Sequence, residues 1–118
     1  MFRRKRVPDH PRRALSPTVL HILLALADGP RHGYAIKQDA ERRSDGAVRL
    51  GPGTLYETIQ RLLDIDLIRE AQADDPMNGQ EAQRRYYALT GRGRRVLREE
   101  LDYLGRLVDY ARSRPELT

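Results

Sequence analysis

The sequence of 118 residues predicts a mainly helical α+β fold with one long C-terminal helix. Apolar residues recur every three or four positions in three separate segments, which is typical of amphipathic helices. Two short strand-forming stretches follow, separated by a polar segment, and this arrangement indicates a hairpin. The last segment then repeats the helical spacing over about 20 residues, or ~30 Å of helix. Together these three features favour a small domain that carries one protruding helix.

The first helix is predicted to begin at Ser16 and Pro17 and to end at Asp28-Gly29-Pro30. Serine is a good N-cap, and proline suits the first helical position because its missing N–H has no partner there. Glycine followed by proline ends a helix. A second, shorter helix is predicted over about residues 33–44. The alternation of apolar and polar residues at 48–50 then predicts a very short strand.

The third helix is predicted from the turn Gly51-Pro52-Gly53-Thr54 to about Asp64. Its apolar positions share one face, which we expect to pack on the core. These positions are Leu55, Ile59, Leu62 and Leu63. The opposite face consists of side chains that form hydrogen bonds, namely Thr54, Tyr56, Glu57, Gln60 and Arg61. Taken alone, such a face is either ordinary solvated surface or a surface that reads a polar partner.

The hairpin is predicted from two strands, Leu67–Ala71 and Arg84–Leu89, joined by a polar loop. The last helix is predicted from its N-cap Thr90 to about Arg112. Its two adjacent apolar stripes are too broad for the small body to cover, so we expect part of it to pack against a second copy. The predicted dimerisation residues are Leu97, Leu101, Tyr103, Leu104, Leu107, Val108, Tyr110 and Ala111.

The net charge of +5 is concentrated at the N-terminus. The first 13 residues hold six basic side chains against Asp9 alone, whereas the rest of the chain has equal numbers of acidic and basic side chains. The six are Arg3, Arg4, Lys5, Arg6, Arg12 and Arg13. Basic arms of this kind bind polyanions, mainly nucleic acid. The alternative is a disordered segment that only solubilises the protein.

Several classes of protein are excluded. The sequence has no cysteine, so it cannot form a disulfide scaffold, a thiolate-ligated metal site or a thiol nucleophile. No apolar run approaches the ~18 residues of a membrane span, and no secretory signal is expected. The three histidines do not cluster by spacing, and no phosphate-binding glycine loop or nucleophile elbow occurs. We therefore expect a cytoplasmic protein that is not an enzyme and needs no cofactor or metal.

The order helix, helix, helix, two-stranded wing is that of a winged helix-turn-helix. Several strings of residues go further and resemble the PadR family of bacterial transcriptional regulators over residues 15–110. The most specific are the Pro-Gly-Thr-Leu-Tyr string at 52–56 and the Tyr-Tyr-Ala-Leu-Thr string at 86–90, taken together. Others are Leu15-Ser16-Pro17, His32-Gly33-Tyr34-Ala35-Ile36, Arg61-Leu62, Leu67-Ile68 and Gly93. The single C-terminal helix is similar to that of the short subgroup.

This resemblance implies a homodimeric repressor that binds a pseudo-palindromic operator in double-stranded DNA, with the third helix in the major groove and the wing on the flanking backbone. The side chains then expected to reach base edges are Thr54, Tyr56, Glu57, Gln60 and Arg61. Those expected to bind phosphates are Arg49, Arg84, Arg85, Arg3, Arg4, Lys5 and Arg6. The expected domains are a basic arm (1–14), a winged helix-turn-helix (15–89) and a dimerisation helix (90–118).

The sequence departs from the family pattern at three places. Gly51 stands where the family often has serine, so the third helix loses its side-chain cap. Asp66 stands where the family often has glycine, a residue that suits the end of a helix. The loop of the wing carries Asp74, Asp75 and Glu81, an acidic set where phosphate contacts are expected. This acidic wing favours an alternative function, a winged-helix protein-interaction module without sequence-specific DNA binding.

A small-molecule effector is also implied by the family. The expected site is the dimer cleft, where an apolar or phenolic molecule would fit. Its expected lining is Leu20, Leu24, Tyr103, Leu107 and Tyr110. The alternative is that these side chains are only core and interface.

Overall fold

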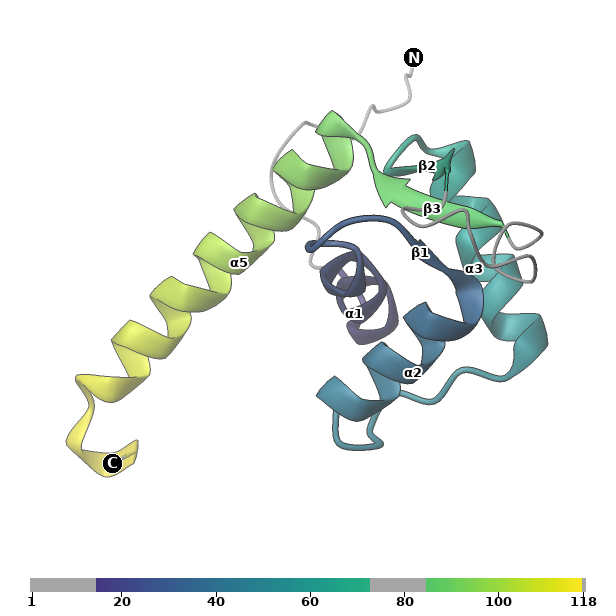
Figure 1. Ribbon diagram of the computed structural model, residues 1–118. Helices are drawn as coiled ribbons and strands as arrows, with labels where there is room; N and C mark the ends of the chain where they lie inside the picture. Colours follow the sequence, from purple (N-terminus) through teal and green to yellow (C-terminus); the bar gives the residue numbers. More distant parts are fainter. Residues whose placement is uncertain (1–14, 73–84, 118) are drawn as a thin grey trace, which may run out of the picture.

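A computed structural model describes residues 15–72 and 85–117. Within these ranges the helices are α1 (Pro17–Ala25), α2 (Gly33–Arg43), α3 (Pro52–Asp64) and α5 (Gly91–Arg112), followed by the 3-10 turn η1 (Pro115–Leu117). The strands are β1 (Arg31–His32), β2 (Ile68–Ala71) and β3 (Tyr86–Leu89). The small sheet lies beside α1, α2 and α3, and α5 projects away from this body (Figure 1). The architecture confirms the predicted α+β winged helix-turn-helix.

The N-termini of α1 and α3 follow the predicted capping chemistry, and α2 begins with a cap that was not predicted. The Ser16 hydroxyl accepts a hydrogen bond from the Val19 amide, 3.2 Å away, and Pro17 occupies the first position of α1. His32 caps α2, since its Nδ1 accepts from the Ala35 amide at 3.2 Å. Gly51 precedes α3 and supplies no side-chain cap, as its residue type predicts.

The sheet is antiparallel with the strand order β1-β3-β2, and its third strand was not predicted. Arg31 pairs with Tyr87 across one edge of β3, and Ile68 pairs with Leu89 across the other. The strand predicted at 48–50 is wrong. There the Val48 amide donates to the Ser44 hydroxyl (2.9 Å). The Leu50 amide donates to the Glu41 carboxylate (3.0 Å). Because side chains take these donors, the segment forms no ladder.

The core lies between the first three helices and the sheet. Its largest fully buried side chains are Ile22, Leu23, Leu26, Ile36, Leu50, Ile59, Leu62 and Ile68. Leu55 is also buried and Leu63 packs against the cluster, which confirms the predicted apolar face of α3. Burial on this scale supplies the main favourable term for folding, about 25 cal/mol for each Å² of apolar surface removed from water.

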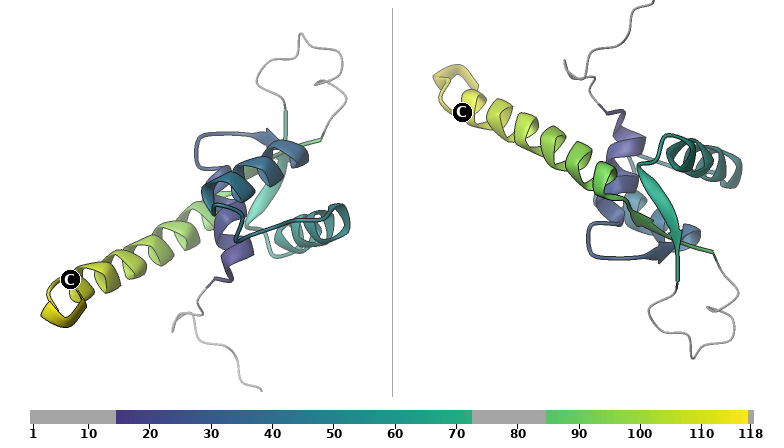
Figure 2. Two further views of the ribbon diagram at one scale, coloured as in Figure 1. Left: turned by 90° about the horizontal axis from the view of Figure 1, so that it is seen from below. Right: turned by 90° about the horizontal axis from the view of Figure 1, so that it is seen from above.

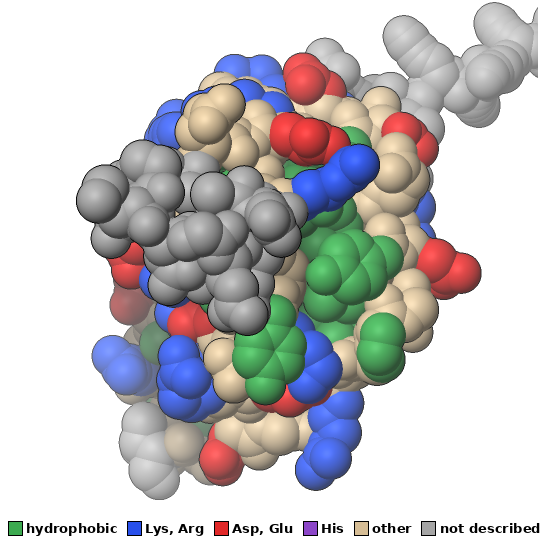
Figure 3. Space-filling view, turned by 45° about the vertical axis from the view of Figure 1, so that its right-hand side comes forward, with side chains coloured by type: hydrophobic (Ala, Val, Ile, Leu, Met, Phe, Trp, Pro, Cys, Tyr) green, Lys and Arg blue, Asp and Glu red, His purple; other side chains and the backbone are tan. Residues whose placement is uncertain are grey.

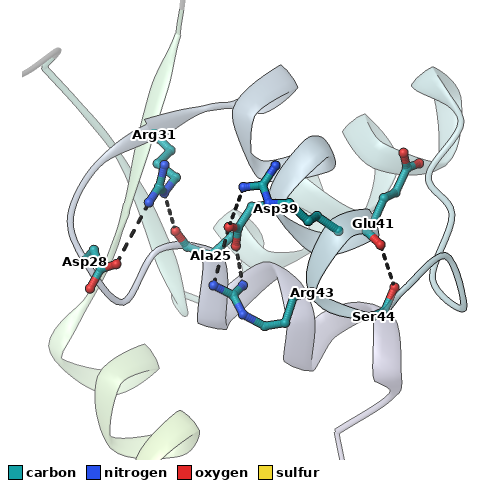
Figure 4. A network of polar contacts seen from close by, with 8 residues as sticks. Ala25, Asp28, Arg31, Asp39, Glu41, Arg43 and Ser44 are labelled. Atoms are coloured by element: carbon teal, nitrogen blue, oxygen red, sulfur yellow. Dashed lines mark hydrogen bonds and ion pairs between the residues drawn. The ribbon is translucent and has the colours of Figure 1, made fainter.

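Polar contacts lie within α2 and between β1 and the end of α1 (Figure 4). Asp39 is almost buried on α2 and forms ion pairs with Arg43 and Arg42, one turn further along the helix. Arg31 donates from Nε to the Ala25 carbonyl (2.6 Å), which ties the start of the sheet to the end of α1. Charged side chains at the edge of the core are thus paired, as burial requires.

Two backbone hydrogen bonds close the C-terminus of α3. The Leu67 amide donates to the Leu62 carbonyl (2.9 Å), and the Asp66 amide to the Leu63 carbonyl (3.1 Å). These two bonds form a Schellman motif, in which Asp66 has a positive φ of 65°. Aspartate tolerates this left-handed conformation better than most residues, so it replaces the usual glycine here.

The first turn of α5 lies directly on this junction. Thr90 caps α5, because its hydroxyl accepts from the Gly93 amide (2.9 Å) and donates to the Asp66 carbonyl (2.6 Å). A Cβ at Gly93 would lie 1.9 Å from the Leu67 carbonyl oxygen, so only glycine fits. α5 is therefore held firmly at its start, whereas the two further views show its later turns extending from the body (Figure 2). No helix among the described residues is long and apolar enough to cross a bilayer.

Candidate nucleic-acid interface

α3 has one buried and one exposed face. Its buried face is Leu55, Thr58, Ile59 and Leu62. Thr58 was not assigned from the sequence, because its hydroxyl hides its place in the apolar spacing. The side chains proposed to read DNA, Thr54, Tyr56, Glu57, Gln60 and Arg61, are all exposed. The structure therefore brings five different hydrogen-bonding groups onto one rigid surface.

Contacts within α3 hold part of this face in place. Gln60 donates from Nε2 to the Asp64 carboxylate, 3.1 Å away and one turn along the helix. Both side chains are exposed, so a stronger partner can replace this bond at small cost. Tyr56 differs from its neighbours, since its ring lies against Gly33 at the start of α2. The outer face is thus preorganised by α3 itself and by α2.

The turn between α2 and α3 is organised by the Glu41 carboxylate. It accepts a hydrogen bond from the Leu50 amide (3.0 Å) and another from Lys37 Nζ (3.2 Å). The backbone bond from Leu50 is the main cause that lowers the pKa of Glu41 below 4.5, and Lys37 adds to it. Because the bond reaches from α2 to Leu50, which precedes the N-cap of α3, this carboxylate helps to set the angle between the two helices.

The basic side chains proposed to bind phosphate are placed in two groups. Arg49 is exposed in the α2–α3 turn and donates from Nε to the Gly46 carbonyl (3.2 Å). Arg85 is exposed at the base of the wing and forms an ion pair with Glu70 of β2 (3.0 Å). The remaining predicted positions, Arg84 and the arm residues Arg3, Arg4, Lys5 and Arg6, lie outside the described residues, as do the acidic loop residues Asp74, Asp75 and Glu81.

A cavity of about 300 Å³ opens between the start of α2, the first turns of α3 and the base of the wing. Its lining is His32, Gly33, Tyr34, Tyr56, Arg85 and Tyr87. Burial raises the pKa of Tyr87 above its usual value, and Arg85 acts in the opposite direction. The space-filling view shows hydrophobic side chains next to basic ones on this side of the molecule (Figure 3). Tyrosine is counted among the hydrophobic side chains in this view. Sequence reasoning did not group these residues, because they come from three separate stretches of the chain.

α5 presents a second exposed surface, which is apolar. Leu101, Leu107, Val108 and Tyr110 are exposed, and Tyr103, Leu104 and Ala111 are half-buried. Leu97 differs from the other predicted dimerisation residues, since it is only 5% exposed and belongs to the core of the single chain. Near the end of the helix, the Arg114 guanidinium lies over the Tyr110 ring at 4.4 Å. The described residues contain no group of three or more side chains that could hold a metal ion.

Comparisons with known proteins agree with this architecture. The model of the transcriptional regulator PadR-like family matches residues 22–99. A 37.1 kDa uncharacterised protein in transposon TN4556 of Streptomyces fradiae is 40% identical over 86 residues, which are 73% of this chain. The chain spans only 22% of that protein's length.

Two solved structures share the fold. A PadR-like transcriptional regulator from Bacillus cereus superposes with a TM-score of 0.65 at 19% identity, over 80% of this chain and 87% of that one. A PadR-like transcription factor from Bacteroides fragilis gives a TM-score of 0.60 at 25% identity, over 80% of this chain and 86% of that one.

Proposed function

This chain belongs to the PadR-like family of transcriptional regulators, and we propose that it acts in the bacterial cytoplasm as a homodimeric repressor that binds a pseudo-palindromic operator. The observation that carries the proposal is the exposed polar face of α3, opposite a fully packed apolar face. An α-helix with such a face fits the major groove, where base edges carry a distinct pattern of donors and acceptors. No catalytic role is part of the proposal.

The proposed division of labour follows from the side-chain chemistry. Gln60 suits adenine, Arg61 suits guanine and Glu57 accepts from cytosine. Thr54 lies at the same face near the start of α3. Arg49, Arg85 and the arm supply charge for phosphates, so a dimer that neutralises about 6–10 phosphates gives a log–log salt slope of roughly −5 to −9.

The proposed domains are the basic arm (1–14), the winged helix-turn-helix (15–89) and the dimerisation helix (90–118). The two copies would meet over the exposed apolar side chains of α5, namely Leu101, Leu107, Val108 and Tyr110, with Tyr103, Leu104 and Ala111 beside them. Exposed apolar surface of this extent on one helix favours a protein partner. Two-fold symmetry then places the two α3 helices on half-sites about one helical turn apart, ~34–36 Å.

We also place the apolar or phenolic effector expected from the family in the cleft of this dimer, between α1 and α5. Leu20 and Leu24 on α1 are half-buried, and Tyr110 on α5 is exposed, so both helices offer apolar surface there. A thermal-shift screen of phenolic ligands tests this part of the proposal. A ligand that raises the melting temperature and lowers operator affinity supports it, and a screen without such a ligand contradicts it.

The main test is binding to the promoter upstream of the chain's own gene, measured by fluorescence anisotropy against random DNA of the same length. We expect operator preference, and we expect Gln60→Ala and Arg61→Ala to reduce it by about 1–3 kcal/mol each. Arg112→Ala is the matched control for the lost charge, since Arg112 is exposed at the far end of α5. Absence of preference in the unmutated protein, with intact partner binding in both variants, would favour the protein-interaction module instead.

A further inference from the structure

We propose that the cavity between α2, α3 and the base of the wing binds one phosphodiester of the DNA backbone. Tyr34, Tyr56 and Arg85 would then bind the DNA backbone, and Tyr56 would not contact a base. This inference rests on the proposed function, because it names a contact through which the domain holds a duplex.

The chemistry of the lining suits a phosphate. Tyr34, Tyr56 and Tyr87 each carry a hydroxyl that donates, and Arg85 carries a guanidinium with five donors. None of the residues that line the cavity is acidic. A phosphodiester offers acceptor oxygens and one negative charge, so the tyrosine hydroxyls can donate to its oxygens and the guanidinium can pair with its charge.

The ion pair between Arg85 and Glu70 does not prevent this contact. The bond uses Nη1 of Arg85, and the side chains are 72% and 56% exposed. An exposed ion pair contributes at most about 1 kcal/mol, so a phosphate can share or replace it at small cost. The pair also holds the guanidinium beside the wing, close to the cavity that Arg85 lines.

The position of Tyr56 separates it from the base-reading residues of α3. A Cβ built on Gly33 would lie 2.7 Å from the Tyr56 hydroxyl oxygen, so the ring rests on the one residue of α2 that leaves room for it. This contact turns the hydroxyl toward α2 and the cavity. Gln60 and Arg61, one turn further along, lie on the exposed face of α3, and Gln60 donates to Asp64 of the same helix.

The shape of the cavity also favours a polymer that lies across the face. Its volume of about 300 Å³ is at the lower limit for small-molecule pockets, and Tyr34 and Tyr56 are each about half exposed. The flat tyrosine rings give a surface on which a deoxyribose can rest while the hydroxyls meet the phosphate. The cavity adjoins the polar face of α3 through Tyr56, so one duplex reaches both.

The experiment measures anisotropy with the operator duplex and with random DNA over a series of salt concentrations. We expect Tyr34→Phe and Tyr56→Phe to weaken binding to both duplexes by the same factor, about three- to tenfold. Arg85→Gln should also reduce the magnitude of the salt slope by about 1 for each copy on the duplex. Gly33→Ala should act like Tyr56→Phe, because the new methyl group displaces the hydroxyl while all ligating groups remain.

Single methylphosphonate substitutions in the duplex then locate the contact. At one position in each half-site, loss of the phosphate charge should weaken the unmutated protein but not Arg85→Gln. Arg112→Gln is the matched control, and circular dichroism checks the fold of every variant. If Tyr56→Phe lowers operator affinity alone, Tyr56 reads a base and the inference is wrong.

Two further outcomes are also decisive. If inorganic phosphate at constant ionic strength protects the unmutated protein but not Arg85→Gln from thermal unfolding, while no methylphosphonate position distinguishes these two proteins, the cavity is a site for a free anion and the backbone assignment is wrong. If the protein lacks operator preference but the methylphosphonate effect persists on random DNA, the proposed repressor function fails while the backbone contact stands.

Discussion

α3 and α5 are both amphipathic helices, yet the single chain covers the apolar face of only one. The buried face of α3 packs against α2 and the sheet, and its outer face is polar. α5 buries Gly93, Leu97 and Glu100 near its start, and beyond them it exposes Leu107 and Val108 to solvent. The difference indicates the kind of partner that each outer face suits, a polar polymer for α3 and a second apolar protein surface for α5.

The largest expected effect comes from the same kind of truncation made on each helix. Ile59→Ala on α3 should lower the free energy of unfolding by about 2–5 kcal/mol, because it leaves a cavity in the core. Leu107→Ala on α5 should change it by less than about 0.5 kcal/mol at protein concentrations where the chain is monomeric. Urea titrations at such a concentration measure both values. Equal losses would mean that the distal part of α5 is packed within one chain.

A second change tests what covers α5. Leu107→Lys together with Val108→Lys should weaken self-association by about 100-fold or more, since it places two charges in the proposed apolar interface. Analytical ultracentrifugation over a range of concentrations measures the dissociation constant. Arg106→Lys, which keeps the charge on the neighbouring residue, is the control. A dimer of unchanged affinity in the double variant would show that another surface joins the two copies.

A third prediction concerns low pH, which should weaken the turn before α3 but not the start of α5. The bonds from Leu50 and Lys37 lower the pKa of Glu41, so they stabilise the fold only while the carboxylate is ionised. Their contribution is fully present above pH about 4.5 and is lost as the pH falls through the lower pKa of the folded state. The start of α5 depends on the Thr90 hydroxyl, which does not titrate in this range.

The melting temperatures of Glu41→Gln and of the unmutated protein, measured between pH 3 and 7, test this effect. The range extends about two units to either side of the usual carboxyl pKa. We expect the variant to be less stable at neutral pH and the difference to shrink as the pH falls. Glu57→Gln controls for loss of one charge without loss of the turn. A constant difference at every pH would show that the charge of Glu41 does not support the turn.

Much of the fold could be predicted from the sequence because its signals are local. The N-caps Ser16 and Thr90 and the apolar spacing of α3 depend on neighbouring residues, and the structure confirms all three. Strand β1 has only two residues and exists through pairing with Tyr86 and Tyr87, far along the chain. No local pattern marks such a strand.

The candidate sites could be predicted only in part, for a related reason. Spacing alone places Leu97 and Val108 on the same side of α5, but the body covers the first and leaves the second exposed. Likewise, the cavity joins side chains from β1, α2, α3 and the wing, and only the folded chain brings these together. Helical periodicity identifies a face, whereas tertiary packing decides what that face meets.

The smallest expected effect lies at the junction between the two helices. Asp66 has a φ of 65° at the end of α3, a conformation that glycine adopts with less strain. Asp66→Gly should therefore raise the free energy of unfolding by about 0.5–1 kcal/mol. Glu57→Gly, in the helical interior of α3, is the matched control and should lower it by about 1 kcal/mol. Urea titrations of both variants should give opposite signs; a loss in both would mean that the Asp66 side chain contributes more at this junction than its backbone strain costs.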